Sequence, residues 1–409
     1  MSIITITSIL VTFCALFSYL NYRFIKLPTT IGIMVMAMIL SAIILFLPIL
    51  GIDILPSVHR IMDGIDFSET LLHGMLSFLL FAGALHVNWK TLQSQKYIIG
   101  AMALFGTVLS TALTGLAAYK IFPVLGFDIP FIYALLFGAL ISPTDPIAVM
   151  AILKKAGAPK TLEIKVVGES LFNDGIAVVL FLTLLGIATH GETTASHVAL
   201  LFVEEAIGGA ILGGALGYVA FIMLRSVDNY QVEILLTLAM VMGGYELANA
   251  LHTSGPIAMV VAGLIVGNVG RDRAMSDHTK QNLDNFWELI DEFLNAILFL
   301  LLGFSLLIIE FNQTALYTGL IMIPLLLLIR YLSVLLPVSF LKKIRNFSPG
   351  AVNILTWGGL RGGISVALVL SLPSGDLRDF LLLVTYCIVM FSIIVQGLTI
   401  GKLVRKYNS

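Results

Sequence analysis

The chain has 409 residues, of which 58% are hydrophobic and 11% charged, and its mean hydropathy is +1.01. Soluble globular proteins are less apolar than this, and long apolar runs recur from end to end, so the composition indicates a polytopic α-helical membrane protein. A net charge of −1 offers no basic surface for nucleic acid, and Cys14 and Cys387 show neither disulfide nor metal-ligand spacing. We therefore expect no nucleic-acid partner and no cofactor.

Thirteen runs are long enough to cross the hydrocarbon core of a bilayer. The first has no positive residue before it, whereas Arg23 and Lys26 follow it, which is the reverse of a secretory signal peptide, so we expect a retained span. No soluble domain is left over, and the prediction is an all-α membrane protein of about 13 transmembrane helices. The runs lie at roughly 3–20, 29–50, 69–88, 97–121, 130–153, 163–188, 198–224, 230–250, 255–269, 285–309, 314–340, 350–372 and 379–403.

The positive residues of the loops are distributed very unevenly between the two sides of the predicted membrane. Counted over alternate loops and the C-terminus, one side holds 18 Lys and Arg residues and the other holds 3. Because cytoplasmic loops carry the excess of positive charge, the richer side is predicted to be cytoplasmic. This places the N-terminus outside and the C-terminus in the cytoplasm, which agrees with an odd number of spans.

Two of the predicted spans carry residues that interrupt a helix near mid-membrane. The fifth contains Ile-Ser-Pro-Thr-Asp-Pro at 141–146, and each proline removes a backbone donor and clashes with the preceding turn. The twelfth contains Trp-Gly-Gly-Leu-Arg-Gly-Gly at 357–363, with four glycines in seven positions. Irregular backbone at this depth survives only inside protein or beside a water-filled cavity. We therefore predict discontinuous helices 5 and 12 that cross at mid-membrane.

The two breaks lie seven spans apart, and an odd offset gives the two copies opposite orientations, as inverted repeats require. Paired interrupted helices in matching positions of two halves are typical of secondary transporters. We predict a single transmembrane transporter domain over 1–409, with repeat one at about 3–188, a linker helix at about 198–224 and repeat two at about 230–403.

The run 163–188 contains the polar segment Gly-Glu-Ser-Leu-Phe-Asn-Asp-Gly at 168–175. A carboxylate at the bilayer centre costs about 2.5–3.5 kcal/mol on insertion scales, so two of them within six residues indicate a function. Helical spacing places Ser170, Asn173 and Asp174 on one face, where they can line a site, and turns Glu169 away from it. Arg361 is then the buried cation that we expect to pair with Glu169 as a structural ion pair.

The polar residues of the two spans have complementary chemistry. Carboxylates and carbonyl oxygens are ligands that hard cations prefer, and Thr144, Asp145 and Asp174 all lie near mid-span. Carbonyls exposed by the break at 141–146 would add further oxygen ligands. No phosphate loop, dinucleotide fingerprint, metal-binding histidine pair or catalytic triad accompanies these residues, so we do not expect an enzyme.

Three motifs in this order and spacing resemble the monovalent cation:proton antiporter family, which includes bacterial NhaP-type exchangers and animal sodium/proton exchangers. They are Ser-Pro-Thr-Asp-Pro-Ile-Ala-Val from 142, Gly-Glu-Ser-Leu-Phe-Asn-Asp-Gly from 168 and Gly-Gly-Leu-Arg-Gly-Gly-Ile-Ser-Val-Ala-Leu from 358. The likeness covers nearly the whole chain. It implies a thirteen-helix inverted-repeat fold, a homodimer in the bacterial inner membrane, and a role in sodium transport and pH homeostasis.

Carried over residue by residue, the resemblance implies that Asp174 is the shared cation and proton site, supported by Asn173, Ser170, Thr144 and Asp145. Transported Na⁺ would be ligated by Asp174, Thr144 and Ser170, and Glu169 and Arg361 would form the ion pair near the crossing. An Asn before the Asp resembles the electroneutral branch of the family, which implies 1:1 exchange unless Asp145 also titrates.

Several residues leave questions open. Many NhaP-type sequences have Glu in a Phe-Glu-Gly motif where this chain has Ala82, which affects the expected coordination of the ion. His73 and His86 titrate in the range of a pH sensor, but are also typical of interfacial positions. The tenth span carries a further polar group that forms either an acidic funnel or a solvated surface, namely Glu288, Asp291, Glu292 and Asn295.

The expected mechanism is competition at one site. A buried bare carboxylate is unfavourable, so Asp174 is expected to reorient across the membrane with either a proton or Na⁺ (or Li⁺) bound. A K⁺/H⁺ antiporter of the same fold is the alternative within this class. A cation channel is the alternative of another class, and an intramembrane protease using Asp145 and Asp174 is disfavoured because its motif contexts are missing from the sequence. The expected partners are monovalent cations, protons and membrane lipid.

Overall fold

The computed structural model describes residues 3–52, 54–56, 58, 67–190, 195–342, 347 and 349–408. Over these ranges the chain is helical, with short 3₁₀ and π turns and no strand. In a bilayer core the backbone N–H and C=O groups have no water to bind, and a helix satisfies them within the segment. The predicted all-α fold is confirmed. Its α-helices are α1 (Ile3–Leu20), α2 (Thr29–Phe46), α4 (Phe67–Glu69), α5 (Leu76–Leu85), α6 (Trp89–Ala101), α7 (Thr107–Val124), α8 (Phe131–Ile141), α9 (Ile147–Lys155), α10 (Lys160–His190), α11 (Ala195–Arg225), α12 (Tyr230–Ala250), α13 (Gly255–Ile265), α14 (Arg271–Arg273), α15 (Asp277–Phe304), α16 (Gln313–Leu341), α17 (Ala351–Trp357), α18 (Gly363–Leu370), α19 (Asp376–Phe391) and α20 (Gly397–Asn408).

Ten helical stretches in the described ranges are long and apolar enough to cross a membrane. They correspond to ten of the predicted spans, and several contain a π turn that joins two α-helices, such as η4 (Met102–Gly106) between α6 and α7 and η7 (Ser392–Gln396) between α19 and α20. The other three predicted spans are present as shorter pieces: α8 with α9, α13 with η5 (Val266–Gly270), and α17 with α18. The full count of thirteen spans stays a prediction.

Polar caps mark where several helices begin. Asn88, Asn229, Ser254, Ser276 and Asn312 precede α6, α12, α13, α15 and α16, and the side-chain oxygen of each accepts a backbone N–H from the first turn. The first N–H groups of a helix have no partner within the helix, so such a cap is worth about 0.5–2 kcal/mol. These short polar residues therefore fix where α6, α12, α13, α15 and α16 start.

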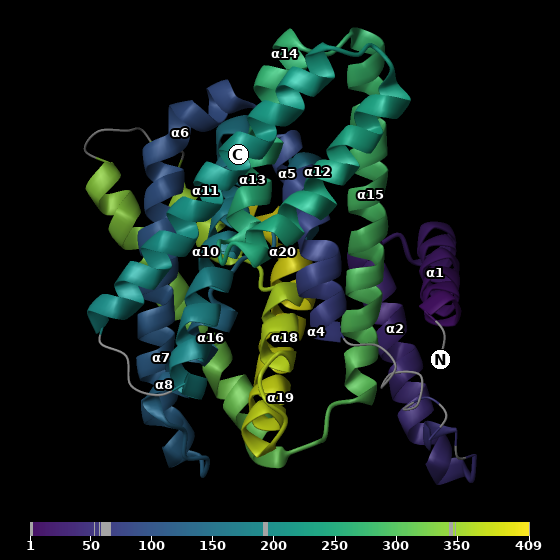
Figure 1. Cartoon of the computed structure of the whole chain (residues 1–409). Helices are drawn as coiled ribbons and strands as arrows, with labels where there is room; N and C mark the ends of the chain where they lie inside the picture. The colour runs from purple at the N-terminus through teal and green to yellow at the C-terminus, as the bar shows by residue number, and fades with distance from the viewer. Residues whose placement is uncertain are drawn as a thin grey trace.

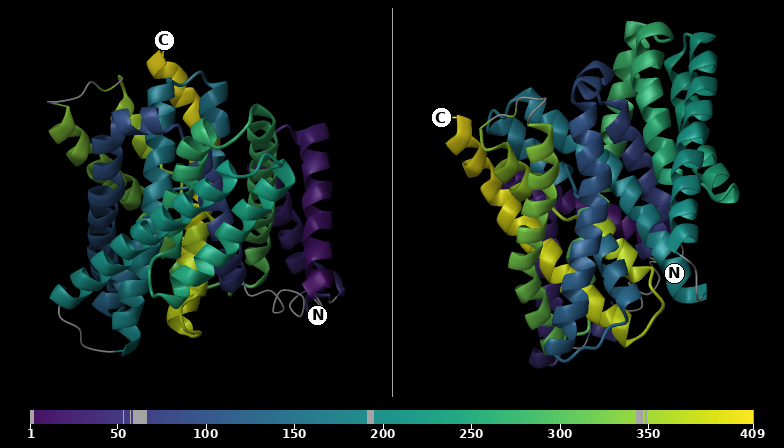
Figure 2. Two further views of the ribbon diagram at one scale, coloured as in Figure 1. Left: turned by 45° about the horizontal axis from the view of Figure 1, so that its top comes forward. Right: turned by 90° about the vertical axis from the view of Figure 1, so that its left-hand side faces the viewer.

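The helices pack in two groups. One group, which we call the site group, contains α6 to α10 and α16 to α20; the other, the flanking group, contains α1, α2, α4, α5, α11, α12, α13 and α15. In Figure 1, α1, α2 and α15 lie on the right, and α6, α7 and α8 lie on the left. In the left view of Figure 2, the N-terminus lies at the lower end of the bundle and the C-terminus at its upper end.

Both predicted breaks are present, and both belong to the site group. The helix α8 ends at Ile141 and α9 begins at Ile147, while α17 ends at Trp357 and α18 begins at Gly363. The two irregular segments meet, because the backbone N–H of Asp145 donates to the carbonyl of Leu360 at 2.7 Å. The prediction of two discontinuous helices that cross each other is confirmed.

Candidate cation site

Thr144 ties the first break to α10. Its Oγ1 lies 2.9 Å from Oγ of Ser170 and accepts a hydrogen bond of 2.8 Å from Nδ2 of Asn173. The backbone N–H of Thr144 in turn donates to Oδ1 of Asn173 at 3.3 Å. All three residues are at most 2% exposed. The hydroxyl of Ser170 and the amide of Asn173 therefore hold the broken segment in place.

Asp174 stands outside this network, although it follows Asn173 directly. It is 7% exposed, and its Oδ1 has no hydrogen-bond partner among the residues that the structure describes. Most buried side-chain polar atoms in proteins have a partner, so each exception requires an explanation. A carboxylate oxygen buried in this way is suited to receive a cation or a proton.

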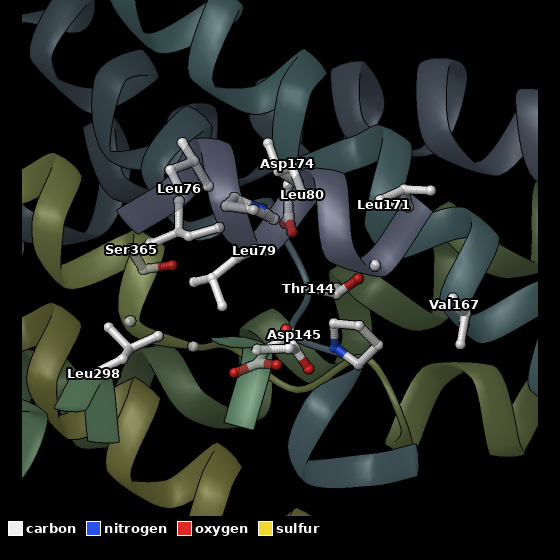
Figure 3. Close-up of a pocket in the computed structure, with 17 residues that line it drawn as sticks. Leu76, Leu79, Leu80, Thr144, Asp145, Val167, Leu171, Asp174, Leu298 and Ser365 are labelled. Carbon is white, nitrogen blue, oxygen red and sulfur yellow. The ribbon is translucent and has the colours of Figure 1, made fainter. Parts of the chain in front are cut away.

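A cavity of about 120 Å³ lies between the two helix groups, and Asp174 forms part of its wall. Thr144 and Asp145 of the first break also line it, and so do residues 362–365 at the start of α18. Figure 3 shows Asp174 and Asp145 reaching this cavity from different segments, with Thr144 near both. Because one water molecule needs about 10–15 Å³, the space suits a small cation with part of its hydration shell.

Of the five residues predicted to form the cation site, some line the cavity and others do not. Asp174, Thr144 and Asp145 line it. Ser170 and Asn173 support Thr144 from behind and are not among the lining residues. Helical spacing predicted that Ser170, Asn173 and Asp174 share one face and can line one site; all three are buried on α10, but only Asp174 lines the cavity.

Arg361 covers the C-terminal end of α8. Its Nη1 donates to the carbonyl of Pro143 at 3.1 Å and also to the carbonyl of Ser142. The last carbonyls of a helix have no partner within the helix, and a cation beside them is favoured by the helix dipole. Carbonyls of the break at 141–146 were expected to act as ligands of the transported cation, but these two accept hydrogen bonds from the guanidinium of Arg361.

The predicted ion pair between Glu169 and Arg361 is wrong. Oε1 of Glu169 accepts from Nη1 of Arg330 at 2.5 Å, and the two side chains are 3% and 7% exposed. The physical reason is that Arg361 is committed to the carbonyls of α8, so that α16, which carries Arg330, supplies the cation for Glu169. Glu169 remains a buried, paired carboxylate, but its partner is a different one.

Arg330 donates to a backbone carbonyl at the second break, as Arg361 does at the first. Its Nη2 donates to the carbonyl of Leu355 at 3.2 Å, in the last turn of α17. Each half-helix that ends at a break thus has one buried arginine at its C-terminal carbonyls. Arg330 additionally joins that end to α10 through Glu169.

Two glycines of the second break allow charged side chains to approach it closely. A Cβ atom on Gly362 would lie 2.5 Å from Oδ2 of Asp145, and one on Gly359 would lie 2.5 Å from Nε of Arg330. Cβ atoms essentially never come this close to another heavy atom. Any larger residue at either position would displace the charged group beside it.

The π turn η7 supplies two further contacts to the second break. Oγ of Ser392 accepts from the backbone N–H of Arg361 at 2.8 Å, and Nε2 of Gln396 donates to the carbonyl of Trp357 at 3.0 Å. Ser392 and Gln396 are buried. An irregular segment leaves backbone groups unsatisfied, and here side chains of a neighbouring helix satisfy them. In the sequence, this role is visible only as two polar residues in an apolar span.

Arg330 was also missed, although the sequence contains a signal for it. Of the 23 Lys and Arg residues, the loop count assigns 18 to one side and 3 to the other. The two that remain are Arg330 and Arg361, both inside predicted spans. A cation within a span faces the protein interior and is normally paired, so the count alone identifies both arginines as structural candidates.

The open questions are answered in part. The acidic residues of α15 were expected to form either an acidic funnel or a solvated surface. Asp291 lines the cavity, as the first alternative requires, whereas Glu288 and Glu292 are exposed, as the second requires. Ala82 is fully buried, and its neighbour Gly83 lines the cavity instead. The side chain of His73 lies outside the part of the chain that the structure describes.

Together, the two discontinuous helices, the buried arginines and the orphan carboxylate define a multi-pass membrane transporter. The chain belongs to the sodium/hydrogen exchanger (transmembrane) family, whose profile matches residues 9–406. Among curated relatives it is similar to the Na⁺/H⁺ antiporter NhaP of Pseudomonas aeruginosa, with 53% identity over 397 residues, 96% of this chain and 94% of the relative. It is also 37% identical to the Na⁺/H⁺ antiporter NhaH of Halobacillus dabanensis, over 89% of this chain and 91% of the relative.

The fold is likewise similar to a solved structure. The sodium proton antiporter MjNhaP1 of Methanocaldococcus jannaschii at pH 8 superposes with a TM-score of 0.77, covering 100% of this chain and 99% of that one. The sequence identity is 18%, so the likeness establishes a shared fold. The family resemblance predicted from the three motifs is confirmed.

Proposed function

We propose that this chain exchanges Na⁺ (or Li⁺) for H⁺ by competition of the two ions at Asp174. The observation that carries the proposal is the buried Oδ1 of Asp174, which has no partner among the described residues and opens on a small cavity. Carboxylate and hydroxyl oxygens suit a hard monovalent cation. A carboxylate can bind either a proton or such a cation, but the cation requires the ionised form. The relatives named as Na⁺/H⁺ antiporters support the choice of substrates.

The charges near the crossing support an exchange of one ion for one. Within the site group, Arg330 and Arg361 supply two positive charges, and Glu169, Asp145 and Asp174 supply three negative charges; Asp291 belongs to the flanking group and is not part of this set. One bound Na⁺ or one proton makes this set neutral, and a charged group is costly to move through a low-dielectric environment. The loaded forms are then the ones that reorient, and the exchange is electroneutral.

Alternating access is proposed to arise from movement of the site group against the flanking group. The cavity lies between them, so a displacement would open it to one side and close it to the other. Discontinuous helices at a repeat interface serve this purpose in secondary transporters. Residues 3–188 and 230–403 would form the inverted repeats, with 198–224 as the linker helix.

The placement of the protein in the cell is part of the proposal. The loop charges, 18 against 3, favour a cytoplasmic C-terminus and an external N-terminus in a bacterial inner membrane. Exposed apolar side chains on α1 and α11, such as Tyr19, Ile207 and Ile211, give these helices a surface that suits lipid or a second copy of the chain. We propose a homodimer.

The test is ion exchange in proteoliposomes. Wild-type protein should acidify or alkalinise the lumen when a Na⁺ gradient is applied, and Asp174→Asn should abolish this response. Glu163→Gln, which removes a carboxylate from the first turn of the same helix, is the matched control and should keep full exchange. Retained Na⁺-driven proton movement in Asp174→Asn would overturn the assignment. A response to K⁺ and none to Na⁺ or Li⁺ would replace the proposed substrate, and flux independent of a proton gradient would indicate a channel.

A further inference from the structure

Among the described residues, the wall of the cavity that belongs to the flanking group carries a single charge. The lining residues of this wall are Leu76, Leu79, Leu80 and Gly83 of α5, and Asp291 and Leu298 of α15. All of these except Asp291 are apolar or glycine, and no Lys, Arg or His is among the described lining residues. The leucines seen in Figure 3 show how apolar this side is. Asp291 therefore shares the lining of one cavity with Asp145 and Asp174.

Asp291 differs from the other carboxylates of its helix. Glu288 and Glu292 flank it on α15, and both are exposed and do not line the cavity. Asp291 is partly buried and does line it. One turn further along α15 lies Asn295, which is 1% exposed. Along this part of α15, the exposed carboxylates are those of Glu288 and Glu292, and Asn295 is buried. Asp291 is the carboxylate that is partly buried and lines the cavity.

The cavity contains an independent sign of a ligand. Oδ1 of Asp174 is buried in its wall with no hydrogen-bond partner among the described residues. The arginines near the crossing do not cancel the charge of Asp291, because Arg330 is engaged by Glu169 and Leu355, and Arg361 by the end of α8. A cation at Asp174 is therefore the group that the additional carboxylate would attract.

We infer that Asp291 is a positioning carboxylate that raises the affinity of the site for Na⁺ in one of its two access states. This inference rests on the proposed exchange at Asp174. Asp291 belongs to the flanking group, whereas Asp174 and Asp145 belong to the site group. Relative movement of the groups carries Asp174 away from Asp291. The carboxylate thus contributes in the arrangement seen here and is lost from the site in the other, which makes the apparent affinity for Na⁺ different on the two sides of the membrane.

The experiment compares Asp291→Asn with Glu292→Gln in vesicles of both orientations. Each variant removes one carboxylate from α15, but only the first removes one from the cavity. Proton movement is recorded as a function of Na⁺ concentration from each side. Asp291→Asn should raise the apparent KM for Na⁺ about threefold or more on one side and leave it unchanged on the other. Glu292→Gln should change neither value, and Asp291→Glu should retain the wild-type value.

Other outcomes would overturn the inference. An apparent KM in Asp291→Asn that equals that of Glu292→Gln on both sides would show that Asp291 does not act on the ion. An equal rise on both sides would contradict its dependence on the access state. If Asp291→Asn does not fold, Asp291→Ser removes the same charge and is measured in its place. Wild-type vesicles without Na⁺-driven proton movement would instead refute the proposed function, so the two failures are distinguishable.

Discussion

Arg330 and Glu169 form a buried ion pair, with Nη1 and Oε1 at 2.5 Å, that joins the middle of α16 to the middle of α10. The same guanidinium donates to the carbonyl of Leu355 at the end of α17. One side chain therefore connects the helix that carries Asp174 with the half-helix that leads into the second break. The position of the proposed cation site depends on this pair, although neither of its members lines the cavity.

Replacing Arg330 by Ala should destabilise the protein by about 3–5 kcal/mol, because the carboxylate of Glu169 remains buried without its partner. The carbonyl of Leu355 also loses its donor. Thermal unfolding of purified protein in detergent measures the effect, and exchange should fall together with the amount of folded protein.

A double variant provides the control for the charge of this pair. Arg330→Met combined with Glu169→Gln removes both charges, and replacing a buried ion pair as a whole is often neutral. The double variant should therefore be more stable than Arg330→Met alone. If the two melt at the same temperature, the unpaired charge of Glu169 is not the source of the destabilisation.

The sequence predicted the two breaks because their causes are local. Prolines at 143 and 146 and the glycines at 358–363 disrupt a helix wherever they occur within it. The sequence also predicted that Glu169 and Asp174 point to different faces of their helix, because residues five apart in a helix lie on different faces. These parts of the prediction required no knowledge of how the helices pack.

The partner of Glu169 was not accessible to the same reasoning. Arg330 is 161 residues away in sequence, and Arg361 is equally cationic and equally buried in an apolar span. Which guanidinium reaches the carboxylate depends on how α16 packs beside the second break, and on the competing demand of the α8 carbonyls for Arg361. Likewise, only the packing of α15 against the site group brings Asp291 to the cavity while Glu292 remains exposed.

Replacing Gly362 by Ala should impair exchange more than folding. The new Cβ would lie 2.5 Å from Oδ2 and 2.6 Å from Cβ of Asp145, which must then move within the cavity wall. The φ of −123° at this position is accessible to Ala, so the effect is steric. Overpacking of this kind costs about 1–3 kcal/mol, and about 1.4 kcal/mol corresponds to a tenfold change in a rate or affinity. We expect Na⁺-driven exchange in proteoliposomes to fall about tenfold.

The matched control for this substitution is Gly243→Ala in α12. A Cβ there would have no atom within 4 Å, so it should leave exchange and melting temperature near the wild-type values. Full exchange by Gly362→Ala would show that the position of Asp145 is not critical for transport.

His86, in the connection between α5 and α6, should make the stability of the protein depend on pH. Partial desolvation of the imidazole, whose side chain is 40% exposed, lowers the pKa of His86 below its ordinary value of 6.5; the carboxylates of Asp284 and Glu288 oppose this shift, and Arg271 and Lys154 reinforce it. The folded protein therefore binds a proton at His86 more weakly than the unfolded chain does. The resulting stabilisation is fully present above pH 6.5 and is lost as the pH falls through the lowered pKa.

Replacing His86 by Gln should make the loss of melting temperature between about pH 7 and 5 smaller. His278→Gln, which alters an exposed histidine on α15, is the control and should follow the wild-type curve. Parallel curves for wild type and His86→Gln would mean that other groups control the acid sensitivity.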